Sequence, residues 1–228
     1  MKFRIPYEKE LNPSQFEAVN ITKGPLLVIA GAGSGKTRTL TYRVARLVEE
    51  GISPSAILLL TFTRKAAQEM LKRASRLLDN RCEGVAGGTF HSFAYSILRK
   101  YASKIGFDHG FSIIDRSDSE NLISMIRKEM KGVSTSGSLP RKQTLANIFS
   151  RAVNKNMSME DIILEDYPHF SRHLESIQGI SNGYRKQKAA HNFFDYDDLL
   201  IYLEMLLKDH PYVREKICST YHLSLIHI

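Results

Sequence analysis

A glycine-rich loop between an apolar run and a helical pattern constrains the fold of this chain most. Residues 28–40 read VIAGAGSGKTRTL. The run LLVIA at 26–30 is short, continuous and partly β-branched, which is typical of a strand buried on both faces of a parallel sheet. After the loop, apolar residues recur at helical spacing, and a second apolar run, AILLLTF, follows at 56–62. The order strand, loop, helix, strand predicts an α/β fold with a parallel sheet.

The helical pattern after the loop has a clear start and end. It begins at Lys36, and its apolar stripe is Leu40, Val44, Leu47 and Val48. Gly51 predicts the end of this helix, because glycine is common just after the last helical turn. Helix and run together place the glycine loop where a phosphate-binding loop requires it.

The loop has the spacing of a phosphate-binding loop, A-x-x-x-x-G-K-T from Ala30 to Thr37, with alanine in place of the first glycine. Its glycines allow backbone N–H groups to point at phosphate oxygens, and the following helix adds the positive end of its dipole. We expect Lys36 to neutralise the β- and γ-phosphates and the Thr37 hydroxyl to ligand Mg²⁺, so both are catalytic candidates. A flexible glycine turn is the alternative. The candidate nucleotide-binding residues are Ala30, Gly31, Ala32, Gly33, Ser34, Gly35, Lys36, Thr37 and Arg38.

A glutamine upstream of the loop is a candidate for reading the base. Residues 10–20, ELNPSQFEAVN, predict a short helix capped by Asn12 or Ser14. The amide of Gln15 offers one donor group and one acceptor, which match the N6 and N7 edge of adenine. An exposed surface glutamine without a ligand is the alternative.

Five segments, in order along the chain, resemble the motifs of UvrD/Rep/PcrA-type superfamily 1 DNA helicases. They are LNPSQFEAV (11–19), AGAGSGKT (30–37), TFTRKAAQEM (61–70), GTFHSFA (88–94) and FDYDDLL (194–200). The resemblance covers nearly the whole chain. It implies a RecA-like P-loop NTPase fold, ATP and Mg²⁺ as cofactors, adenine reading by Gln15, and 3′-to-5′ unwinding of DNA in repair or replication. It also implies single-stranded or forked DNA as the partner.

Two of these motifs supply candidate DNA contacts at strand ends. Ligands collect beyond the carboxyl ends of strands in open α/β sheets, so residues there should face the nucleotide crevice. Phe62 is the candidate for stacking on a base, and burial of Phe62 in the core is the alternative. Arg64 stands where the family more often has asparagine. The candidate DNA-binding residues are Thr61, Phe62, Thr63, Arg64, Thr89 and His91.

The middle of the chain reads as helical. Ser117-x-x-Glu120 and Ser158-x-x-Asp161 are helix-start patterns, and KGVSTSGSLP at 131–140 is a loop. We expect residues 110–190 to form a helical subdomain inserted into a RecA-like ATP-binding domain of residues 1–109 and 191–228. In the family such a subdomain guides duplex DNA.

Charge in this region is uneven. Residues 126–155 contain one acid and seven basic residues: Arg127, Lys128, Lys131, Arg141, Lys142, Arg151 and Lys155. This excess of basic side chains predicts either a solvated helical face or contacts with phosphates. The formal net charge of the chain is +8, which favours a polyanionic partner. Three acidic residues lie close together at Asp195, Asp197 and Asp198. They suggest either a metal-binding cluster or, as we expect, the acidic N-terminus of a helix.

Other features restrict the class of protein. The two cysteines, Cys82 and Cys218, have no metal-ligand spacing, so we expect plain thiols. No apolar run approaches the ~20 residues of a membrane span, and no signal peptide is evident, so we expect a soluble cytoplasmic protein without membrane contact. The sequence does not specify an oligomeric state.

The resemblance also implies an acidic pair that this sequence does not show. In the family an Asp-Glu pair closes an apolar strand soon after the segment HPYVREKICSTYH (210–222), but here LSLIHI follows and places His227 and Ile228 at those positions. Imidazole is a poor magnesium ligand, and isoleucine has no acid. We therefore expect a C-terminally truncated motor domain without its second motor domain, which binds ATP and single-stranded DNA but does not turn ATP over. The alternatives are a non-enzymatic nucleotide- or DNA-binding module and, less supported, a small-molecule kinase.

Overall fold

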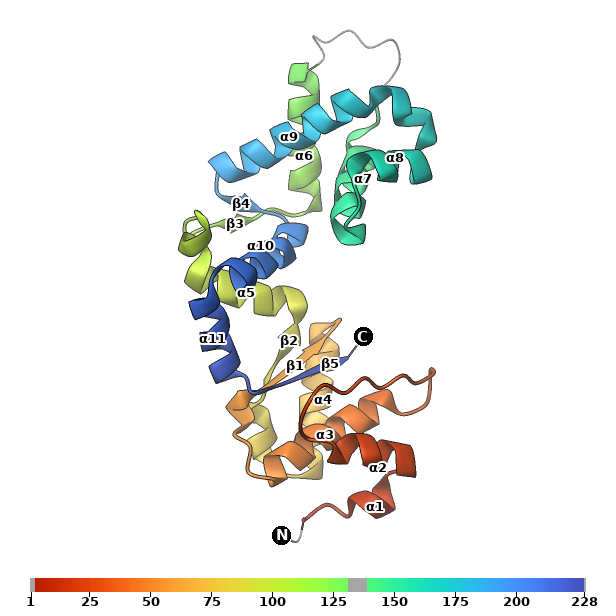
Figure 1. The fold of residues 1–228 in the computed structure, drawn as a ribbon, viewed down its shortest axis with the longest axis vertical. Coiled ribbons are helices and arrows are strands. Elements are labelled where there is room, and N and C mark those ends of the chain that lie inside the picture. Colours follow the sequence, from red (N-terminus) through yellow and green to blue (C-terminus); the bar gives the residue numbers. More distant parts are fainter. Residues whose placement is uncertain (1–2, 131–138, 228) are drawn as a thin grey trace. The chain divides into compact units, whose positions relative to one another are not determined.

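A short parallel sheet lies around one fully buried strand. In the computed structural model, which describes residues 3–130 and 139–227, strand β1 (Ile57–Thr61) has all five residues buried. It pairs in parallel with β2 (Ala86–Thr89) on one side and β5 (Leu223–His227) on the other, which gives the order β2-β1-β5 (Figure 1). Thr61 lies opposite both Thr89 and His227, so the carboxyl ends of the three strands share one edge. The predicted strand at 56–62 is confirmed.

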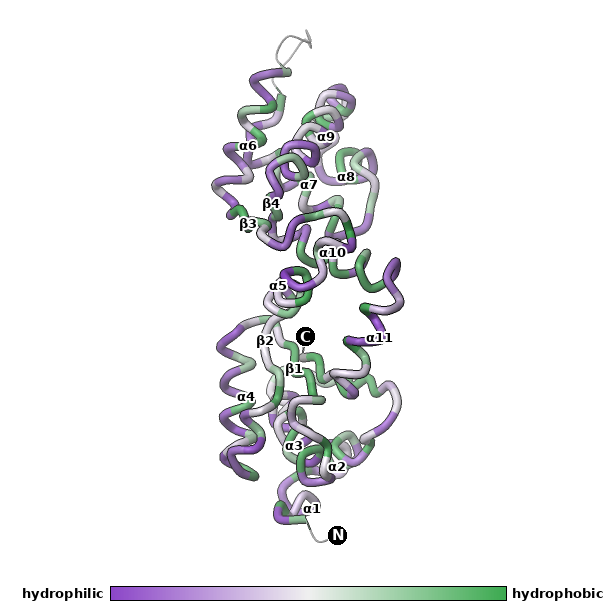
Figure 2. The backbone as a smooth tube through the Cα atoms, turned by 90° about the vertical axis from the view of Figure 1, so that its left-hand side faces the viewer, coloured by the Kyte–Doolittle hydropathy of each residue, from purple (hydrophilic) through white to green (hydrophobic). Residues whose placement is uncertain are grey.

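Two amphipathic helices cover this sheet. Helix α3 (Lys36–Glu49) contacts β5, and helix α4 (Arg64–Leu77) contacts β1 and β2, while the two helices also contact each other. The approach of α4 to β2 is close, because a Cβ added at Gly87 would lie 2.7 Å from Cδ1 of Leu71. In Figure 2, β1 is hydrophobic along its length, whereas α4 alternates between hydrophilic and hydrophobic turns. This alternation is the pattern of a helix with one buried face.

The end of α3 follows the prediction. Gly51 has φ +89°, and its N–H donates to the Val48 carbonyl, while Ile52 N–H donates to the Leu47 carbonyl. These bonds satisfy carbonyls that the last helical turn leaves without partners. The predicted apolar stripe of α3 also faces the core, with Val44, Leu47 and Val48 buried.

The chain divides into two units, residues 1–93 with 211–228 and residues 94–210. In unit 1 the described elements other than the sheet, α3 and α4 are α1 (Tyr7–Glu10), α2 (Pro13–Asn20), the 3₁₀ turns Pro54–Ala56 and Asn80–Gly84, the start of α5 (Phe90–Tyr101) and α11 (Pro211–Thr220). Its core joins residues of α3, α4, β1 and β5 with Ile5, Tyr7 and Leu11 of the N-terminal segment.

Unit 2 is mainly helical. Its elements are the rest of α5, β3 (Ser112–Ile113), α6 (Arg116–Glu129), α7 (Lys142–Lys155), α8 (Met159–Asp166), α9 (Leu174–Ala190), β4 (Phe193–Phe194), α10 (Tyr196–Asp209) and the 3₁₀ turns Ala102–Ile105 and Pro168–His173. Its core is built from isoleucines and leucines of α6, α7, α8 and α9 together with Phe149 and Tyr184. Strands β3 and β4 form a separate two-stranded parallel pair.

Unit 2 is wider than the stretch that we expect to form an inserted subdomain. That stretch, residues 110–190, lies within unit 2, which begins at Ala94 and ends at His210. Strand β4 pairs with β3, and α10 contacts the turn that follows α5 and strand β4, all within unit 2. The loop predicted at 131–140 lies mostly outside the described residues.

The predicted strand at 26–30 is wrong for this structure. Residues 25–31 do not form a strand. The four apolar residues 26–29, called the run 26–29 below, have exposed side chains: Leu26, Leu27, Val28 and Ile29. Leu27 is 83% and Ile29 is 89% exposed. A strand forms only where a neighbour supplies hydrogen bonds to its backbone, and none of the described strands pairs with this run.

One predicted helix start is displaced and another is confirmed. Helix α6 is capped by Asp115, whose carboxylate accepts the N–H of Asp118, so the pattern beginning at Ser117 does not cap it. Helix α8 is capped by Ser158, whose hydroxyl oxygen accepts the N–H of Asp161, as the sequence predicts. An aspartate two residues upstream displaces Ser117 because it is an equally good cap.

Candidate nucleotide and strand-edge site

The glycine loop before α3 has a geometry that suits glycine. Gly33 has φ +76° and Gly35 has φ +86°, in the left-handed region that other residues rarely adopt. Gly35 is the N-cap of α3, so the unpaired N–H groups of the first helical turn lie beside the loop. The Ser34 hydroxyl donates a 2.7 Å hydrogen bond to the Gly31 carbonyl and closes the turn. Such a helix start is an anion-binding arrangement.

The cation of the loop lies against the loop itself. The ammonium of Lys36 donates to the carbonyl oxygens of Ala30 (2.7 Å) and Gly31 (2.9 Å). Three of the residues in the predicted motif therefore converge, with Lys36 folded back across the loop from the first turn of α3. Residues Gly31 to Ser34 are exposed, so the loop is open to a ligand.

Gln15 contacts the loop. Its position on α2 is fixed by a capping box, in which Asn12 accepts the N–H of Gln15 and the Gln15 amide oxygen accepts the N–H of Asn12. The amide nitrogen of Gln15 donates a 3.0 Å hydrogen bond to the Ser34 carbonyl. It is so close to the loop that a Cβ at Gly35 would lie 2.7 Å from it. The structure thus brings together two motifs that are separate in the sequence.

Thr37 and Arg38 follow the loop in the first turn of α3. Thr37 is half-buried, and its carbonyl accepts the hydroxyl of Thr41. The Arg38 guanidinium donates to the carbonyl oxygen (2.7 Å) and to the carboxylate (2.9 Å) of Glu10. Glu10 at the end of α1 was not singled out from the sequence, because an acid near a helix end is common on any surface.

The residues at the end of β1 divide into structural and exposed groups. Thr61 is fully buried, and its hydroxyl donates to the carbonyl of Thr63. The Thr63 hydroxyl caps α4 by accepting the N–H of Ala66. Phe62 is 91% exposed, so the alternative that it packs in the core is wrong. Arg64, the first residue of α4, is also exposed.

The end of β2 forms a second local network. Thr89 and Ser92 exchange hydrogen bonds, with Thr89 N–H donating to the Ser92 hydroxyl and Ser92 N–H donating to the Thr89 hydroxyl. This pair starts α5, so Ser92 is a structural residue that the sequence reasoning missed. His91 lies in the first turn of the same helix and is half-buried. Thr89 and Thr61 occupy the same edge of the sheet.

A magnesium site is only partly supplied. The strand β5 ends at the same edge, with His227 opposite Thr61 in the register. Over residues 3–130 and 139–227, no group of three or more His, Cys, Asp or Glu side chains is arranged to hold a metal. Mg²⁺ commonly keeps several waters and binds through substrate phosphates and few protein oxygens. The Thr37 hydroxyl and a bound triphosphate fit that mode.

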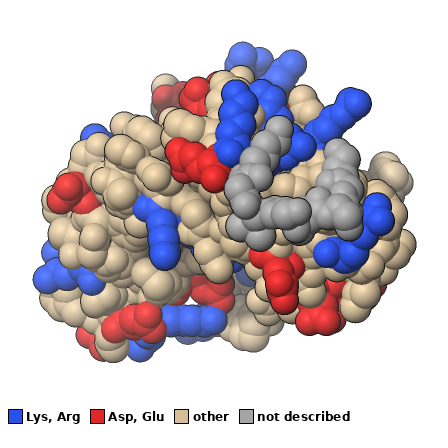
Figure 3. All heavy atoms as spheres, turned by 90° about the horizontal axis from the view of Figure 1, so that it is seen from above, with Lys and Arg blue, Asp and Glu red and all other residues tan. Residues whose placement is uncertain are grey.

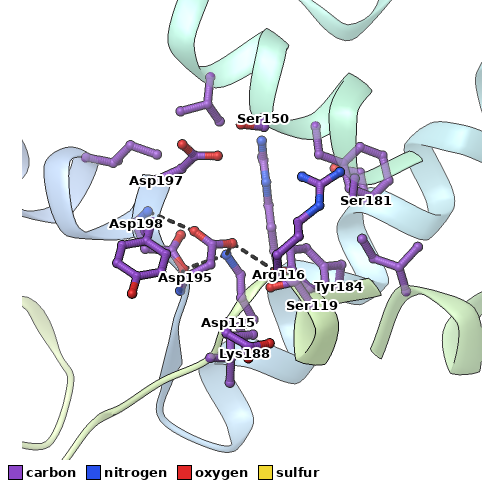
Figure 4. Close-up of a pocket in the computed structure, with 18 of the residues that line it drawn as sticks. Asp115, Arg116, Ser119, Ser150, Ser181, Tyr184, Lys188, Asp195, Asp197 and Asp198 are labelled. Atoms are coloured by element: carbon purple, nitrogen blue, oxygen red, sulfur yellow. Dashed lines mark hydrogen bonds and ion pairs between the residues drawn. The ribbon is translucent and has the colours of Figure 1, made fainter. Parts of the chain in front are cut away.

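The three acids near 195 belong to a helix start in unit 2. Asp195 caps α10 in a capping box with Asp198, which confirms the expected acidic helix N-terminus. The ammonium of Lys188, which is 5% exposed, lies 2.6 Å from Asp195 and 2.5 Å from Asp198. These residues line a cavity of about 460 Å³ between α6, α7, α9 and α10. Figure 4 shows Lys188, Asp195 and Asp198 together at this cavity. Asp197 lies apart from Lys188 and accepts a hydrogen bond from Asn154.

Electrostatics in this network are asymmetric. Burial and the neighbouring charge of Asp195 raise the pKa of Asp198 to about 6, although Lys188 opposes the shift. Burial alone would raise the pKa of Asp195 as well, but the ion pair with Lys188 and hydrogen bonds outweigh burial and lower it. One buried cation thus serves two carboxylates, and Asp198 is the one that takes up a proton more easily.

Part of the basic run of 126–155 is neutralised within unit 2. Arg151 pairs with Asp166 (3.3 Å), and Lys155 pairs with Asp166 (3.2 Å) and Glu165 (3.7 Å). Arg127 and Lys142 also donate to protein oxygens, and Lys131 lies outside the described residues. Figure 3 shows lysines and arginines interspersed with acids on the face that it presents. These contacts favour the solvated-face interpretation for the end of α7.

Comparison with known proteins gives one consistent result. Residues 11–227 match the family described as UvrD/REP helicase N-terminal domain. The ATP-dependent DNA helicase PcrA of Staphylococcus aureus (strain NCTC 8325 / PS 47) is 36% identical over 208 residues, which are 90% of this chain and 27% of that protein. The PcrA of Staphylococcus epidermidis (strain ATCC 12228 / FDA PCI 1200) is 38% identical over 196 residues, 85% of this chain and 26% of that protein. The chain thus spans about a quarter of the length of these relatives. Across the described residues, no helix has the length and apolar character to span a membrane.

Proposed function

Because this chain belongs to the UvrD/REP helicase family through its N-terminal domain, we propose that it is the ATP- and single-stranded-DNA-binding part of an ATP-dependent 3′-to-5′ DNA helicase. In this proposal unit 1 contains the RecA-like P-loop core, and the helices between residues 110 and 190 are a subdomain inserted into it. Single-stranded or forked DNA is the partner. A second motor domain would belong to the remainder of a longer protein, as the quarter-length coverage of the relatives suggests.

The observation that carries the proposal is the contact between Gln15 and the glycine loop. The Gln15 amide nitrogen donates to the Ser34 carbonyl in the same loop whose Ala30 carbonyl accepts from Lys36. An amide with a donor and an acceptor next to a phosphate loop suits a nucleotide whose base is adenine. Residues Gly31 to Lys36 would hold the phosphates, and Thr37 would hold Mg²⁺, which would supply charge neutralisation at the β- and γ-phosphates.

The edge of the sheet supports the DNA part of the proposal. Phe62 is a large aromatic at the carboxyl end of a buried strand, and it is almost fully exposed. Exposed aromatic side chains provide stacking surfaces for unpaired bases without reading sequence. Thr63, Arg64, Thr89 and His91 would contact the sugar-phosphate chain from the same edge.

We propose that this stretch alone binds ATP without hydrolysing it. Hydrolysis in P-loop enzymes needs an acidic strand end for the metal and a second group to orient water. The residue at the end of β5 is His227, which lies opposite Thr61 in the sheet. A neutral imidazole is a poor ligand for Mg²⁺. ATP binding and ATP turnover should therefore separate in this chain.

The test is phosphate release from ATP and Mg²⁺ with and without single-stranded DNA, in the wild type and in Lys36→Ala, alongside ATP binding by fluorescence. The proposal expects ATP binding that Lys36→Ala abolishes, and no release of phosphate. DNA-stimulated release that Lys36→Ala abolishes would show that another carboxylate completes the site. A non-enzymatic module, the alternative, would bind single-stranded DNA with an affinity that ATP does not change.

A further inference from the structure

The N-terminal segment that carries Gln15 is tied to α3 by a polar cluster of three residues, Glu10, Arg38 and Tyr42. Arg38 donates to both the carbonyl and the carboxylate of Glu10 and lies 3.2 Å from the Tyr42 hydroxyl. The Tyr42 hydroxyl in turn donates 3.1 Å to the same carboxylate, and the Arg38 guanidinium lies 4.9 Å from the Tyr42 ring centroid. The Glu10 carboxylate therefore has two donors on one helix, α3.

Glu10 lies next to the residues that orient Gln15. It is the last residue of α1, and Asn12, two positions later, caps α2 by accepting the N–H of Gln15. The Gln15 side chain is then held at both ends, by Asn12 N–H on its oxygen and by the Ser34 carbonyl on its nitrogen. Only one residue, Leu11, separates Glu10 from Asn12 in the sequence.

The rest of the segment has its own attachments to the core. Tyr7 and Leu11, on either side of Glu10, are 3% and 6% exposed. Arg43 on α3 is buried and donates to the Ala18 carbonyl near the end of α2. Loss of the Glu10 side chain should therefore leave α1 and α2 packed against the core. It should change only how closely the start of α2 approaches the glycine loop.

From these contacts we propose that Glu10 is a positioning residue for nucleobase recognition, which holds Gln15 over the phosphate loop by anchoring the α1–α2 turn to Arg38 and Tyr42. The inference rests on the proposed function, because it assumes that Gln15 reads the base. Glu10 itself touches no nucleotide in this arrangement. Phosphate binding depends on Lys36 and the loop, whereas selectivity for the base depends on Glu10 through Gln15.

The test compares ligands with and without a base. Dissociation constants for ATP, GTP and inorganic tripolyphosphate, each with Mg²⁺, are measured for the wild type, Glu10→Ala, Glu10→Gln and the control Glu8→Ala, which removes an exposed acid from the same helix. Loss of one hydrogen-bonded contact to the base predicts that Glu10→Ala weakens ATP binding about tenfold and lowers the preference for ATP over GTP. Tripolyphosphate binding should stay unchanged. Glu10→Gln, whose amide oxygen still accepts from Arg38 and Tyr42, should restore most of the ATP affinity.

The outcomes separate the inference from the proposed function. If Glu10→Ala keeps the wild-type ratio of ATP to GTP affinity, or weakens ATP and tripolyphosphate equally, Glu10 does not position the base-reading group. In that case the proposed function would still hold if Lys36→Ala abolishes the binding of tripolyphosphate. A wild type that binds neither ATP nor tripolyphosphate would overturn both. Melting temperatures of all variants show whether α1 and α2 stay folded.

Discussion

The ammonium of Lys188 lies 2.5 Å from the carboxylate of Asp198 and is almost completely buried, on the last turn of α9 facing the first turn of α10. Asp195 shares the same cation at 2.6 Å. Tyr184 also donates to Asp195 from the same side of α9 as Lys188. Within this network one buried cation is therefore shared by two carboxylates.

This network predicts a pH-dependent stability of unit 2. The pKa of Asp198 is raised from 3.8 to about 6, so the folded state holds its proton more tightly than the unfolded chain does. The stabilisation is fully present below 3.8 and is lost as pH rises through about 6, by at most about 1.4 kcal/mol per pH unit. The pKa of Asp195 is lowered from 3.8, so the change in stability that Asp195 causes occurs below pH 3.8 and outside this pH range. Urea unfolding between pH 4 and 7 measures the trend.

The matched variant for this prediction is Asp198→Asn, which removes the titrating group and keeps an oxygen for Lys188. Other carboxylates titrate in both proteins, so the informative quantity is the difference between wild type and variant. That difference in free energy of unfolding should move in favour of the variant as pH rises from 4 to 6. A difference that stays constant across this range would mean that Asp198 titrates normally.

Substitutions of three left-handed glycines separate strain from collision with Gln15. Gly33, Gly35 and Gly51 all have positive φ, but only at Gly35 would a Cβ meet a neighbour, Gln15 Nε2 at 2.7 Å. Alanine at Gly33 or Gly51 should therefore cost about 1–2 kcal/mol of stability from backbone strain alone. At Gly35 the Cβ would meet the far end of the flexible Gln15 side chain, so Gly35→Ala should also displace that amide and weaken ATP binding. Thermal unfolding measures the strain, and fluorescence titration measures ATP binding. A wild-type affinity for ATP in Gly35→Ala would argue against the Gln15 contact.

Phe62 should matter for DNA and not for folding. Because the side chain is 91% exposed, Phe62→Ala should change stability by less than about 0.5 kcal/mol. If Phe62 stacks on a base, the same change should weaken single-stranded DNA binding by roughly 1–3 kcal/mol. Fluorescence anisotropy with a labelled oligonucleotide measures this, and Tyr212→Ala, an exposed aromatic on α11, is the control. Equal effects of both variants would point to nonspecific loss of apolar surface.

The run 26–29 predicts self-association of the isolated chain. Contiguous exposed apolar side chains promote association between copies, and Leu27 and Ile29 are the most exposed of the four. The double variant Leu27→Lys, Ile29→Lys should sediment as a smaller species at the same concentration, with an unchanged melting temperature. Gln68→Lys with Asn80→Lys adds the same charge at exposed polar positions and should leave association unchanged. A wild type that is monomeric at high concentration would contradict the prediction.

Local patterns predicted the elements that depend on near neighbours in sequence. Helix α3 begins at Lys36 and ends before Gly51, as the apolar stripe and the glycine predict, because caps and stripes are properties of a short segment. Gln15 and the loop were paired from their motifs, and the structure places them in contact. Phe62 could be placed at a strand end but not assigned as exposed, since periodicity does not report what covers a side chain.

Other features depend on distant partners and could not be predicted. The composition of 26–30 is that of a buried strand, but a strand exists only if another strand pairs with it. The sequence likewise gives no sign that Phe193 and Phe194 pair with Ser112 and Ile113. The contact of Glu10 with Arg38 joins residues 28 positions apart, and neither residue alone carries a motif that predicts it.

The register of the central sheet has a consequence for how the chain is made. Ile57 pairs with Leu223, and the whole of unit 2 lies between them in sequence. On a ribosome, β1 would emerge early and keep one edge open until the end of unit 2 had been synthesised, while unit 2, being continuous, could fold first. Open strand edges and late, distant pairing favour slow folding and association with other nascent chains. The topology therefore leaves one edge of β1 without its partner for the time that unit 2 takes to be synthesised.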